Sequence, residues 1–246
     1  MNWFRIAGMR LPTLKLNARC GRAVSAIFAL AFAGVVAAGC RTSPPNSLAT
    51  HNSDKWKNEI AAIEARVATN RPPPGCIIFV GSSGIKRWAN LAADFPDLPV
   101  YNHGFGGSQL ADLVNFADRV IVPFQPREVV IYAGGNDINA HKDPVVVFGD
   151  FVALVSNIHA ALPRTRIAYI SSAPNLKRWA QVGKVERLNS LAAAYCRRHG
   201  MDFINVFPRM LGAEGKPRPD IFVEDGLHMN AAGYAIWAAA VRPFLK

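Results

Sequence analysis

Short, almost continuously apolar runs restrict the fold of this chain more than any other feature of its sequence. The clearest are Ile77–Val80, Val129–Ala133, Ile167–Ile170 and Phe203–Val206, and Pro99–Asn102 is a weaker fifth. Runs without polar alternation are typical of strands that are buried on both faces of a parallel sheet. The sequence therefore predicts five parallel strands.

Helical stretches separate these runs. Their signals are polar N-caps, a proline at a first helical position and apolar residues gathered on one face. The predicted helices are Gln109–Val120 after Ser108, Pro144–Leu162 after Asp143, Val182–His199 before Gly200, and Ala231–Leu245 after Asn230. An amphipathic helix with Trp56, Ile60, Ile63 and Val67 on one face precedes the first strand. This alternation predicts one α/β domain, a three-layer α/β/α sandwich around a five-stranded parallel sheet.

The N-terminal region differs from the rest of the chain. Residues 1–39 contain five basic and no acidic residues, and the apolar segment Ala23–Ala38 is followed by Gly39-Cys40. Such a segment is short for a membrane span but suits the core of an export signal. The ending Ala37-Ala38-Gly39-Cys40 resembles a bacterial lipobox, although Ala37 stands where leucine is usual. We predict a lipoprotein signal peptide over 1–39, lipidation of Cys40, a polar tether over 40–52 and a folded domain over 53–246.

Lipidation of Cys40 would determine where the protein is located. Two or more acyl chains on Cys40 would hold the protein stably at a membrane. Arg41, where an aspartate would resemble a retention signal for the inner membrane, favours the outer membrane of a bacterial cell envelope, facing the periplasm. Simple signal cleavage and an uncleaved anchor stay open as alternatives. Because this compartment permits disulfides, the pairing of Cys76 with Cys196 is also left open.

The charge of the chain does not indicate a nucleic-acid partner. The formal net charge is +11, but only +6 remains once residues 1–39 are set aside. No basic stripe interleaved with aromatic residues supports nucleic-acid binding. The histidines show no paired spacing for a metal, and two cysteines in the body of the chain cannot make a zinc cluster. We therefore expect no metal and no nucleic acid.

Polar residues follow the predicted strands at the points where each strand ends. Ser83 follows the first, Gly107 the second and Asn136 the third, while Asp225 and His228 come after the last strand and a longer loop. Ligands of open parallel sheets collect outside the carboxyl ends of the strands. A nucleophile, a base, an orienting carboxylate and donors for an oxyanion are the groups that acyl transfer requires. The combination points to that chemistry, although each fragment alone is weak.

Two other enzyme classes are disfavoured by missing motifs. The chain contains no Gly-x-Ser-x-Gly elbow, which argues against the α/β-hydrolase fold. Gly104-x-Gly106 is followed by Gln109 where a dinucleotide-binding fingerprint needs a third glycine.

Four sequence blocks resemble the SGNH (GDSL-type) hydrolase family, in the branch to which bacterial lipoproteins belong. The blocks are Gly81-Ser82-Ser83, the segment Asn102–Ser108 with Gly107, Gly134-Gly135-Asn136-Asp137, and Asp225-Gly226-Leu227-His228. The resemblance covers about residues 76–245, nearly the whole domain. It implies a flavodoxin-like sheet and hydrolysis of an ester through an acyl-enzyme, with no metal or organic cofactor.

The resemblance also implies a role for each block. Ser83 would attack the ester, His228 would act as base and then acid, and Asp225 would orient the imidazole. The backbone N–H groups of Ser83 and Gly107 and the side-chain amide of Asn136 would form the oxyanion hole.

Two positions depart from the family pattern. Ser82 stands where aspartate is commonest, which alters local hydrogen bonding but leaves the nucleophile in place. His103 stands where arginine is expected, and we place its side chain at a surface turn rather than in the pocket.

The substrate is less well defined by the sequence. Asn175, Arg178 and Trp179 follow the fourth strand and are candidate substrate-binding residues, with a solvated loop as the alternative. The leading hypothesis is an exported, membrane-tethered esterase that acts on small acyl esters such as sugar acetates or lipid-like molecules. An acyltransferase that uses the same site, or a non-catalytic lipoprotein that binds the envelope, stays open as an alternative. The sequence leaves the oligomeric state unknown.

Overall fold

We describe the fold from a computed structural model, which defines residues 43–246. The predicted signal peptide and the predicted lipidation site at Cys40 lie outside the described residues.

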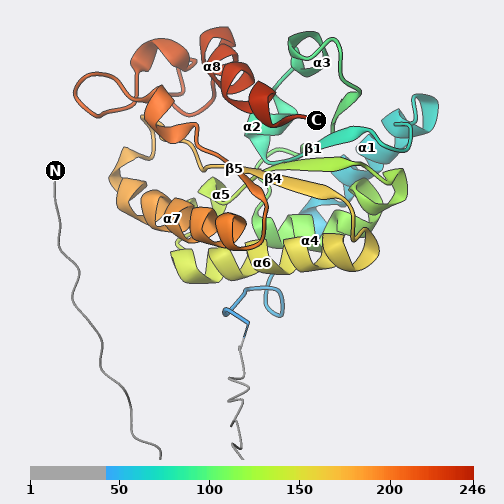
Figure 1. The fold of residues 1–246 in the computed structure, drawn as a ribbon. Helices are drawn as coiled ribbons and strands as arrows, with labels where there is room; N and C mark the ends of the chain where they lie inside the picture. The colour runs from blue at the N-terminus through green and yellow to red at the C-terminus, as the bar shows by residue number, and fades with distance from the viewer. Residues whose placement is uncertain (1–42) are drawn as a thin grey trace, which may run out of the picture. The chain divides into compact units, whose positions relative to one another are not determined.

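A single parallel sheet of five strands forms the middle layer of the domain (Figure 1). The strands are β1 (Ile77–Gly81), β2 (Val100–Asn102), β3 (Glu128–Tyr132), β4 (Arg166–Ile170) and β5 (Asp202–Ile204). Their order is β2-β1-β3-β4-β5, and every pair is parallel. This order places a switch point between β1 and β3, where doubly wound sheets bind their ligands. The predicted fold class is confirmed.

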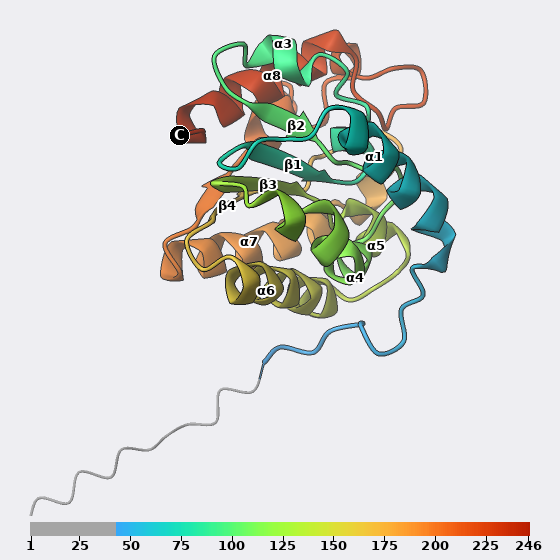
Figure 2. The same cartoon turned by 90° about the vertical axis from the view of Figure 1, so that its right-hand side faces the viewer.

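Helices cover both faces of the sheet. They are α1 (Lys57–Thr69), α2 (Ser83–Lys86), α3 (Leu91–Asp94), α4 (Leu110–Val120), α5 (Gly135–Asn139), α6 (Pro144–Ala161), α7 (Val182–Arg198) and α8 (Ala231–Val241). Short 3₁₀ turns lie at Asp54–Trp56, Val122–Phe124, Trp179–Gln181, Phe207–Met210, Pro219–Ile221 and Arg242–Phe244. In Figures 1 and 2, α2, α3 and α8 lie on one side of the sheet, whereas α4, α6 and α7 lie on the other.

Local sequence signals define most helix ends. The Asp143 carboxylate accepts a hydrogen bond from the Val145 N–H at 2.8 Å, and Asn230 Oδ1 accepts one from the Ala232 N–H at 2.9 Å, so both predicted N-caps are confirmed. Helix α4 starts one residue later than predicted and is capped by Gln109, whose N–H donates to Asp112 Oδ2 at 2.8 Å. The last predicted helix changes to a 3₁₀ turn after Val241, because Pro243 cannot continue the ladder of hydrogen bonds.

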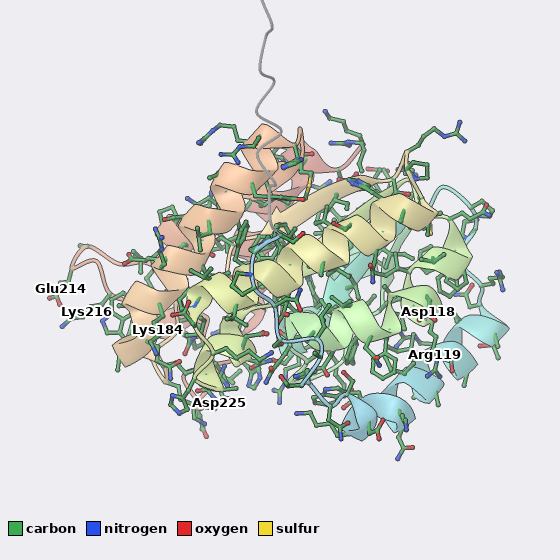
Figure 3. The ribbon with its side chains drawn as sticks, turned by 90° about the horizontal axis from the view of Figure 1, so that it is seen from below. Asp118, Arg119, Lys184, Glu214, Lys216 and Asp225 are labelled. Atoms are coloured by element: carbon green, nitrogen blue, oxygen red, sulfur yellow. The ribbon has the colours of Figure 1, made fainter. Side chains whose placement is uncertain are left out.

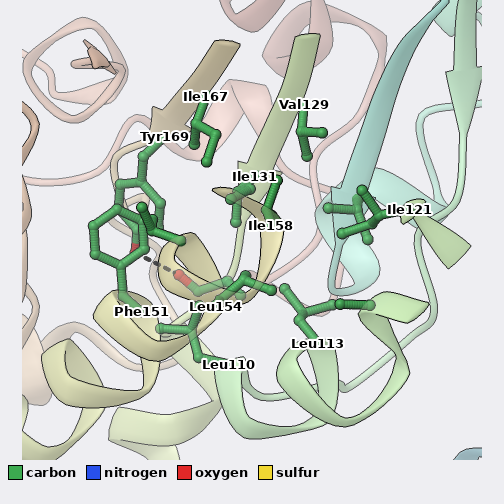
Figure 4. Packing of buried hydrophobic residues seen from close by; sticks show 14 of the residues in the cluster. Leu110, Leu113, Ile121, Val129, Ile131, Phe151, Leu154, Ile158, Ile167 and Tyr169 are labelled. Carbon is green, nitrogen blue, oxygen red and sulfur yellow. Dashed lines mark hydrogen bonds between the residues drawn. The ribbon is translucent and has the colours of Figure 1, made fainter. Parts of the chain in front are cut away.

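Alternating strand residues supply the two halves of the core. Ile78 and Val80 face the cluster beneath α4 and α6, whereas Ile77 and Phe79 face the cluster beneath α3 and α8. Figure 4 shows the first cluster, in which the Tyr169 hydroxyl donates to the carbonyl of Ala133 at 2.7 Å. Burial on both sides explains why the strands read as unbroken apolar runs.

By length and composition alone, α6 is the one helix within residues 43–246 that could cross a membrane. Among the residues that it buries, Phe151, Leu154 and Ile158 contribute to the core. It is therefore a covering helix of the sheet.

His103 does not lie at a surface turn, and this prediction is wrong. Its side chain is 1% exposed, its Nδ1 lies 2.7 Å from the carbonyl oxygen of Val120, and its ring packs against Phe124. Burial lowers the pKa of His103 to about 4, which keeps the imidazole neutral near pH 7. The side chain is instead enclosed by the C-terminal end of α4 and by Phe124, which a pattern of neighbouring residues does not reveal.

The two cysteines of the domain are free and buried. Burial raises the pKa of Cys76 to about 11 and that of Cys196 to about 12. Thiols held neutral in this way are poor nucleophiles and pack as small apolar side chains.

Residues 43–52, the described part of the segment expected to be a tether, run past α4 and α6 (Figure 2) and are hydrogen-bonded to both helices. The backbone N–H and the hydroxyl of Ser47 both donate to the Asp150 carboxylate at 2.7 Å. A Cβ at Gly149 would lie 1.8 Å from the carbonyl oxygen of Pro45, so only glycine permits this approach. His51 and Ser53 both bind Asp112. Composition indicated a linker, but it does not reveal that two buried carboxylates on α4 and α6 bind it.

Candidate active site

Three side chains from distant parts of the sequence form a chain of hydrogen bonds at the carboxyl end of the sheet. His228 Nε2 lies 3.1 Å from Ser83 Oγ, and His228 Nδ1 lies 2.5 Å from Asp225 Oδ2. The imidazole is thus between the hydroxyl and the carboxylate. Figure 3 labels Asp225 at the periphery of the molecule, consistent with the side chain being 35% exposed. The structure therefore brings the three predicted residues together in the order that a serine nucleophile requires.

A tight loop holds Asp225 and His228 in register. Asp225 Oδ1 accepts hydrogen bonds from the N–H groups of Leu227 and His228 at 2.9 and 2.8 Å. The backbone N–H of His228, followed by its imidazole, lowers the pKa of Asp225 below its usual range. The carboxylate is therefore ionised at neutral pH and can accept a hydrogen bond from the imidazole.

Neighbouring elements also fix this loop. The Asn230 side-chain amide donates to the carbonyls of Asp220 and Phe222, at 2.8 and 3.2 Å, while its oxygen caps α8. The Tyr234 hydroxyl donates to the carbonyl of Gly84 at 3.1 Å and links α8 to the helix that begins at Ser83.

Ser83 is the first residue of α2, and only Ser82 separates it from the end of β1. The Ser82 N–H donates to the carbonyl of Tyr132 at 3.0 Å, and the Ser82 carbonyl accepts from Ile85 and Lys86. Ser82 itself is 6% exposed. Ser82 stands where aspartate is commonest. Its backbone hydrogen bonds hold the turn in place, so the turn does not need a carboxylate at this position.

Three hydrogen-bond donors, one of them the backbone N–H of Ser83 itself, belong to residues of the cleft. Gly107 and Asn136 line the cleft that contains Ser83 and His228. Among residues 43–246, the backbone N–H groups of Ser83 and Gly107 have no protein acceptor. Asn136 Nδ2 donates one hydrogen to the carbonyl of Ser108 at 3.0 Å, which leaves its second hydrogen free. This set of donors can bind a negatively charged oxygen.

Backbone conformation restricts the residue type at position 107. Gly107 has a φ of +78°, and a Cβ there would lie 3.0 Å from the Trp56 ring. A larger residue would therefore combine backbone strain with a steric contact. The glycine keeps this N–H at the cleft.

The structure separates the three candidate substrate-binding residues. Asn175 and Arg178 line the cleft, but Trp179 is absent from its lining and packs against the core beneath α7. Asn175 Oδ1 accepts from the Arg178 N–H at 2.9 Å, and Arg178 Nη1 donates to Asn136 Oδ1 at 3.0 Å. Neither the spacing nor the composition of the loop predicts which of the three side chains face the cleft and which faces the core.

Two groups of residues around the cleft were not predicted from the sequence. Tyr132 at the end of β3 and Trp237 on α8 contribute an aromatic wall. A search of strand ends for large side chains as well as polar ones would have found Tyr132. No pattern in the sequence places Trp237 at the cleft, because it lies in the middle of α8 and not at the end of a strand.

The second missed group is a polar network behind the helix that contains Asn136. Asp137 accepts from the Leu110 N–H at 3.2 Å, and Lys142 Nζ lies 3.6 Å from Asp137 and 3.3 Å from Asp150. Burial raises the pKa of Asp137 to about 6. The network joins α5 to α4 and α6, so it holds Asn136 from behind. Within residues 43–246, no group of three or more His, Cys, Asp or Glu side chains could hold a metal ion.

The sheet order and the serine, histidine and carboxylate at its edge resemble those of hydrolases with a three-layer α/β fold. The chain belongs to the GDSL-like lipase/acylhydrolase family, whose sequence model matches residues 73–236. The family predicted from the four sequence blocks is thereby confirmed. None of the curated proteins compared with the sequence matches it.

Solved structures share the fold at low sequence identity. A GDSL-like lipase from Bacteroides thetaiotaomicron is 20% identical, with a TM-score of 0.61, over 78% of this chain and 96% of that one. A protein from Streptococcus pneumoniae, described as a proposed platelet activating factor, is 19% identical, with a TM-score of 0.66, over 78% and 94%. A variant of an acetylxylan esterase from Geobacillus stearothermophilus is 16% identical, with a TM-score of 0.57, over 69% and 94%. At these identities the similarity shows a shared architecture.

Proposed function

We propose that this protein is an exported serine esterase that hydrolyses carboxylic esters through an acyl-enzyme on Ser83. The observation that supports this most directly is the chain of hydrogen bonds from Ser83 Oγ through His228 to Asp225. Membership of the acylhydrolase family gives independent support for ester chemistry. A non-catalytic binding protein would have no need of an imidazole held between a hydroxyl and an ionised carboxylate.

In the first half of the reaction, Ser83 Oγ forms a bond to the carbonyl carbon while its proton passes to His228 Nε2. Asp225 stabilises the resulting imidazolium through Nδ1. The carbonyl oxygen becomes negatively charged and binds the N–H groups of Ser83 and Gly107 and the amide of Asn136. His228 then gives its proton to the leaving alcohol as the ester bond breaks.

In the second half, water replaces the alcohol. His228 takes a proton from the water, whose oxygen attacks the acyl carbon, and returns that proton to Ser83 Oγ as the acid leaves. No metal or organic cofactor enters this scheme. Attack by an alcohol instead of water would make the same site an acyltransferase.

The cleft suits a small ester. Its wall combines the aromatic groups Tyr132 and Trp237 with the polar groups Asn175 and Arg178. The acetylxylan esterase with the same fold acts on acetylated sugar, as its name states. We therefore favour sugar acetates or short lipid-like esters as substrates of this chain.

The test is turnover of p-nitrophenyl esters, from acetyl to palmitoyl, by the full chain in mild detergent. Ser83→Ala removes the nucleophile and should lower kcat/KM by at least about 10⁴-fold, with the circular dichroism spectrum unchanged. Ser190→Ala is the matched control, because Ser190 donates only to a carbonyl in its own helix, α7. Turnover by Ser83→Ala equal to that of the control would refute the role of Ser83.

We further propose that Cys40 is lipidated and holds the protein at the outer membrane, facing the periplasm. The supporting observation is the basic and apolar stretch that ends in Ala37-Ala38-Gly39-Cys40. Cys40→Ser should move the protein from the membrane fraction to the soluble fraction of the cell envelope. Continued membrane retention of this variant would point to an uncleaved anchor instead.

A further inference from the structure

Three cationic side chains border the cleft beside Ser83 and His228. They are Lys86, Arg87 and Arg178. Lys86 Nζ is paired with Glu59 at 2.7 Å. Arg87 and Arg178 form no ion pair with any carboxylate in the described part of the chain. The cleft therefore contains two guanidinium groups whose charge the protein leaves uncompensated.

Arg178 is the more informative of the two, because it is half-buried and held in place. Its N–H donates to Asn175 Oδ1, and the neighbouring Lys177 N–H donates to the carbonyl of Gly226 at 3.0 Å. These bonds tie the loop after β4 to the loop of Asp225 and His228. The guanidinium cannot readily move out into solvent without loss of its contact with Asn136.

The donors of Arg178 are mostly unused. Nη1 donates to Asn136 Oδ1 at 3.0 Å and lies 3.4 Å from the carbonyl of Gly135. A guanidinium has five N–H donors, and the other nitrogens have no protein partner within residues 43–246. Burial lowers the pKa of Arg178, yet an arginine stays charged. Half-burying a charge without a counter-ion is unfavourable, and a bound anion would reverse that cost.

The two carboxylates beside the cleft, Asp225 and Glu59, do not meet this need, because Glu59 is already paired with Lys86 and accepts from the Gly106 N–H. Asp225 already accepts hydrogen bonds from His228 Nδ1 and from the N–H groups of Leu227 and His228. The Arg178 guanidinium thus lines the same cleft as Ser83 and His228 and has no carboxylate partner there. Arginine binds carboxylates and phosphates in a bidentate geometry, which fits a substrate group of that kind.

We propose that the cleft selects esters that carry an anionic group, a carboxylate or a phosphate, within reach of the Arg178 guanidinium. Arg87, further out and exposed, strengthens the positive potential at the entrance. This inference rests on the proposed esterase function and specifies its substrate class. The sugar or lipid ester that the protein hydrolyses therefore carries a negative charge near the scissile bond.

The experiment compares matched anionic and neutral esters with the full chain. Mono-p-nitrophenyl succinate against its methyl ester, methyl p-nitrophenyl succinate, places the charge on the acyl side at equal acyl length. 4-Acetoxybenzoate against its methyl ester places the charge on the alcohol side. We expect kcat/KM to favour the anionic ester in at least one pair, and the better pair identifies which side of the substrate Arg178 meets.

Arg178→Gln should then lower kcat/KM for the anionic ester on the order of 10- to 100-fold more than for its neutral partner, the usual range for a hydrogen bond to a charged group. Arg178→Lys keeps the charge and should retain part of this selectivity. Lys177→Gln is the matched control, since it removes one positive charge from an exposed neighbour outside the cleft. It should leave the selectivity unchanged.

A purely positioning role for Arg178, acting through Asn136, gives a different result. Arg178→Gln would then lower turnover of both members of a pair equally, and this outcome would overturn the proposal. Equal kcat/KM for anionic and neutral esters in the unaltered protein would also overturn it. In both cases turnover of the neutral esters still reports the esterase function, so the two proposals fail separately.

Discussion

Two clusters in this molecule contain the same three side chains, a serine, a histidine and an aspartate, but in different arrangements. In the upper cluster, at the cleft, His228 lies between Ser83 and Asp225. In the lower cluster, where the N-terminal segment meets α4, Asp112 Oδ1 lies between His51 Nε2 and Ser53 Oγ, at 2.7 Å from each. The residue types are equal, so only their order and surroundings distinguish the two sites.

The order decides what the hydroxyl can do. Ser83 has a base within reach of its proton, and that base is stabilised in its cationic form by a carboxylate behind it. Ser53 donates directly to a carboxylate, and no hydrogen bond joins it to His51 in the described structure. A carboxylate is a weak base, so it holds the Ser53 proton without activating the oxygen.

Burial separates the two clusters further. The Asp112 side chain is inaccessible to solvent, whereas Asp225 is 35% exposed and lies at the cleft. A buried carboxylate needs its donors for stability, because an unpaired charge in the interior is costly. The lower cluster therefore attaches the N-terminal segment to α4, and the upper one is open to a substrate.

The sharpest test of this comparison is to remove each histidine in turn. His228→Ala should lower kcat/KM for p-nitrophenyl acetate by roughly 10⁴- to 10⁶-fold, since in the proposed mechanism this one group serves as base and acid in both halves of the reaction. His51→Ala should leave kcat/KM close to that of the unaltered protein. It should instead lower the free energy of unfolding in urea by about 1–3 kcal/mol, because Asp112 loses a partner.

The two variants are controls for each other. His228→Ala should unfold at nearly the same urea concentration as the unaltered protein. Loss of turnover in His51→Ala at a urea concentration where it is fully folded would mean that the N-terminal segment contributes to the site. The division between a catalytic and a structural cluster would then be wrong.

The sequence predicted the upper cluster and not the lower one, and the reason is physical. Ser83, Gly107 and Asn136 each lie within about five residues of the end of a strand, and parallel strands bring their carboxyl ends to one edge. The position of these residues can therefore be predicted from the strands alone. His51, Ser53 and Asp112 lie on a polar segment and inside a helix, where nothing in the local sequence indicates that they meet.

The predictable parts of the fold are those that depend on local sequence. Strand runs, helix caps such as Asp143 and Asn230, and the sheet edge depend on neighbours in the sequence or on regular geometry. The direction of Trp179 away from the cleft, the burial of His103 and the attachment of Ser47 to Asp150 depend on packing between distant segments. Single residues of that kind carry no periodic signal.

His103 extends the comparison to a third histidine, one with no carboxylate. Its Nδ1 meets the backbone carbonyl of Val120, and its Nε2 is buried without a partner. A proton on Nε2 would therefore create a buried cation with no counter-ion, which is why burial lowers the pKa of His103 to about 4 from an ordinary value of 6.5. The folded state binds this proton more weakly than the unfolded chain does.

Stability should therefore depend on pH at this residue. Between pH 4 and 6.5 the unfolded chain holds a proton on His103 that the folded protein lacks, so the unfolding free energy should fall as the pH falls through this window. The full difference between the two pKa values corresponds to about 3 kcal/mol. His103→Gln should lose this dependence, as measured by urea unfolding of both proteins at several pH values from 4 to 7.5.

Taking the difference between the two proteins isolates His103 from Asp137. Burial raises the pKa of Asp137 to about 6, so its own contribution to stability falls as the pH rises from about 4 to 6, opposite in sign to that of His103. Both proteins contain Asp137, and its effect cancels in the difference. Identical pH dependence in the two proteins would mean that His103 gains a partner for its proton in solution, as His228 has in Asp225, and the distinction between paired and unpaired histidines would no longer hold.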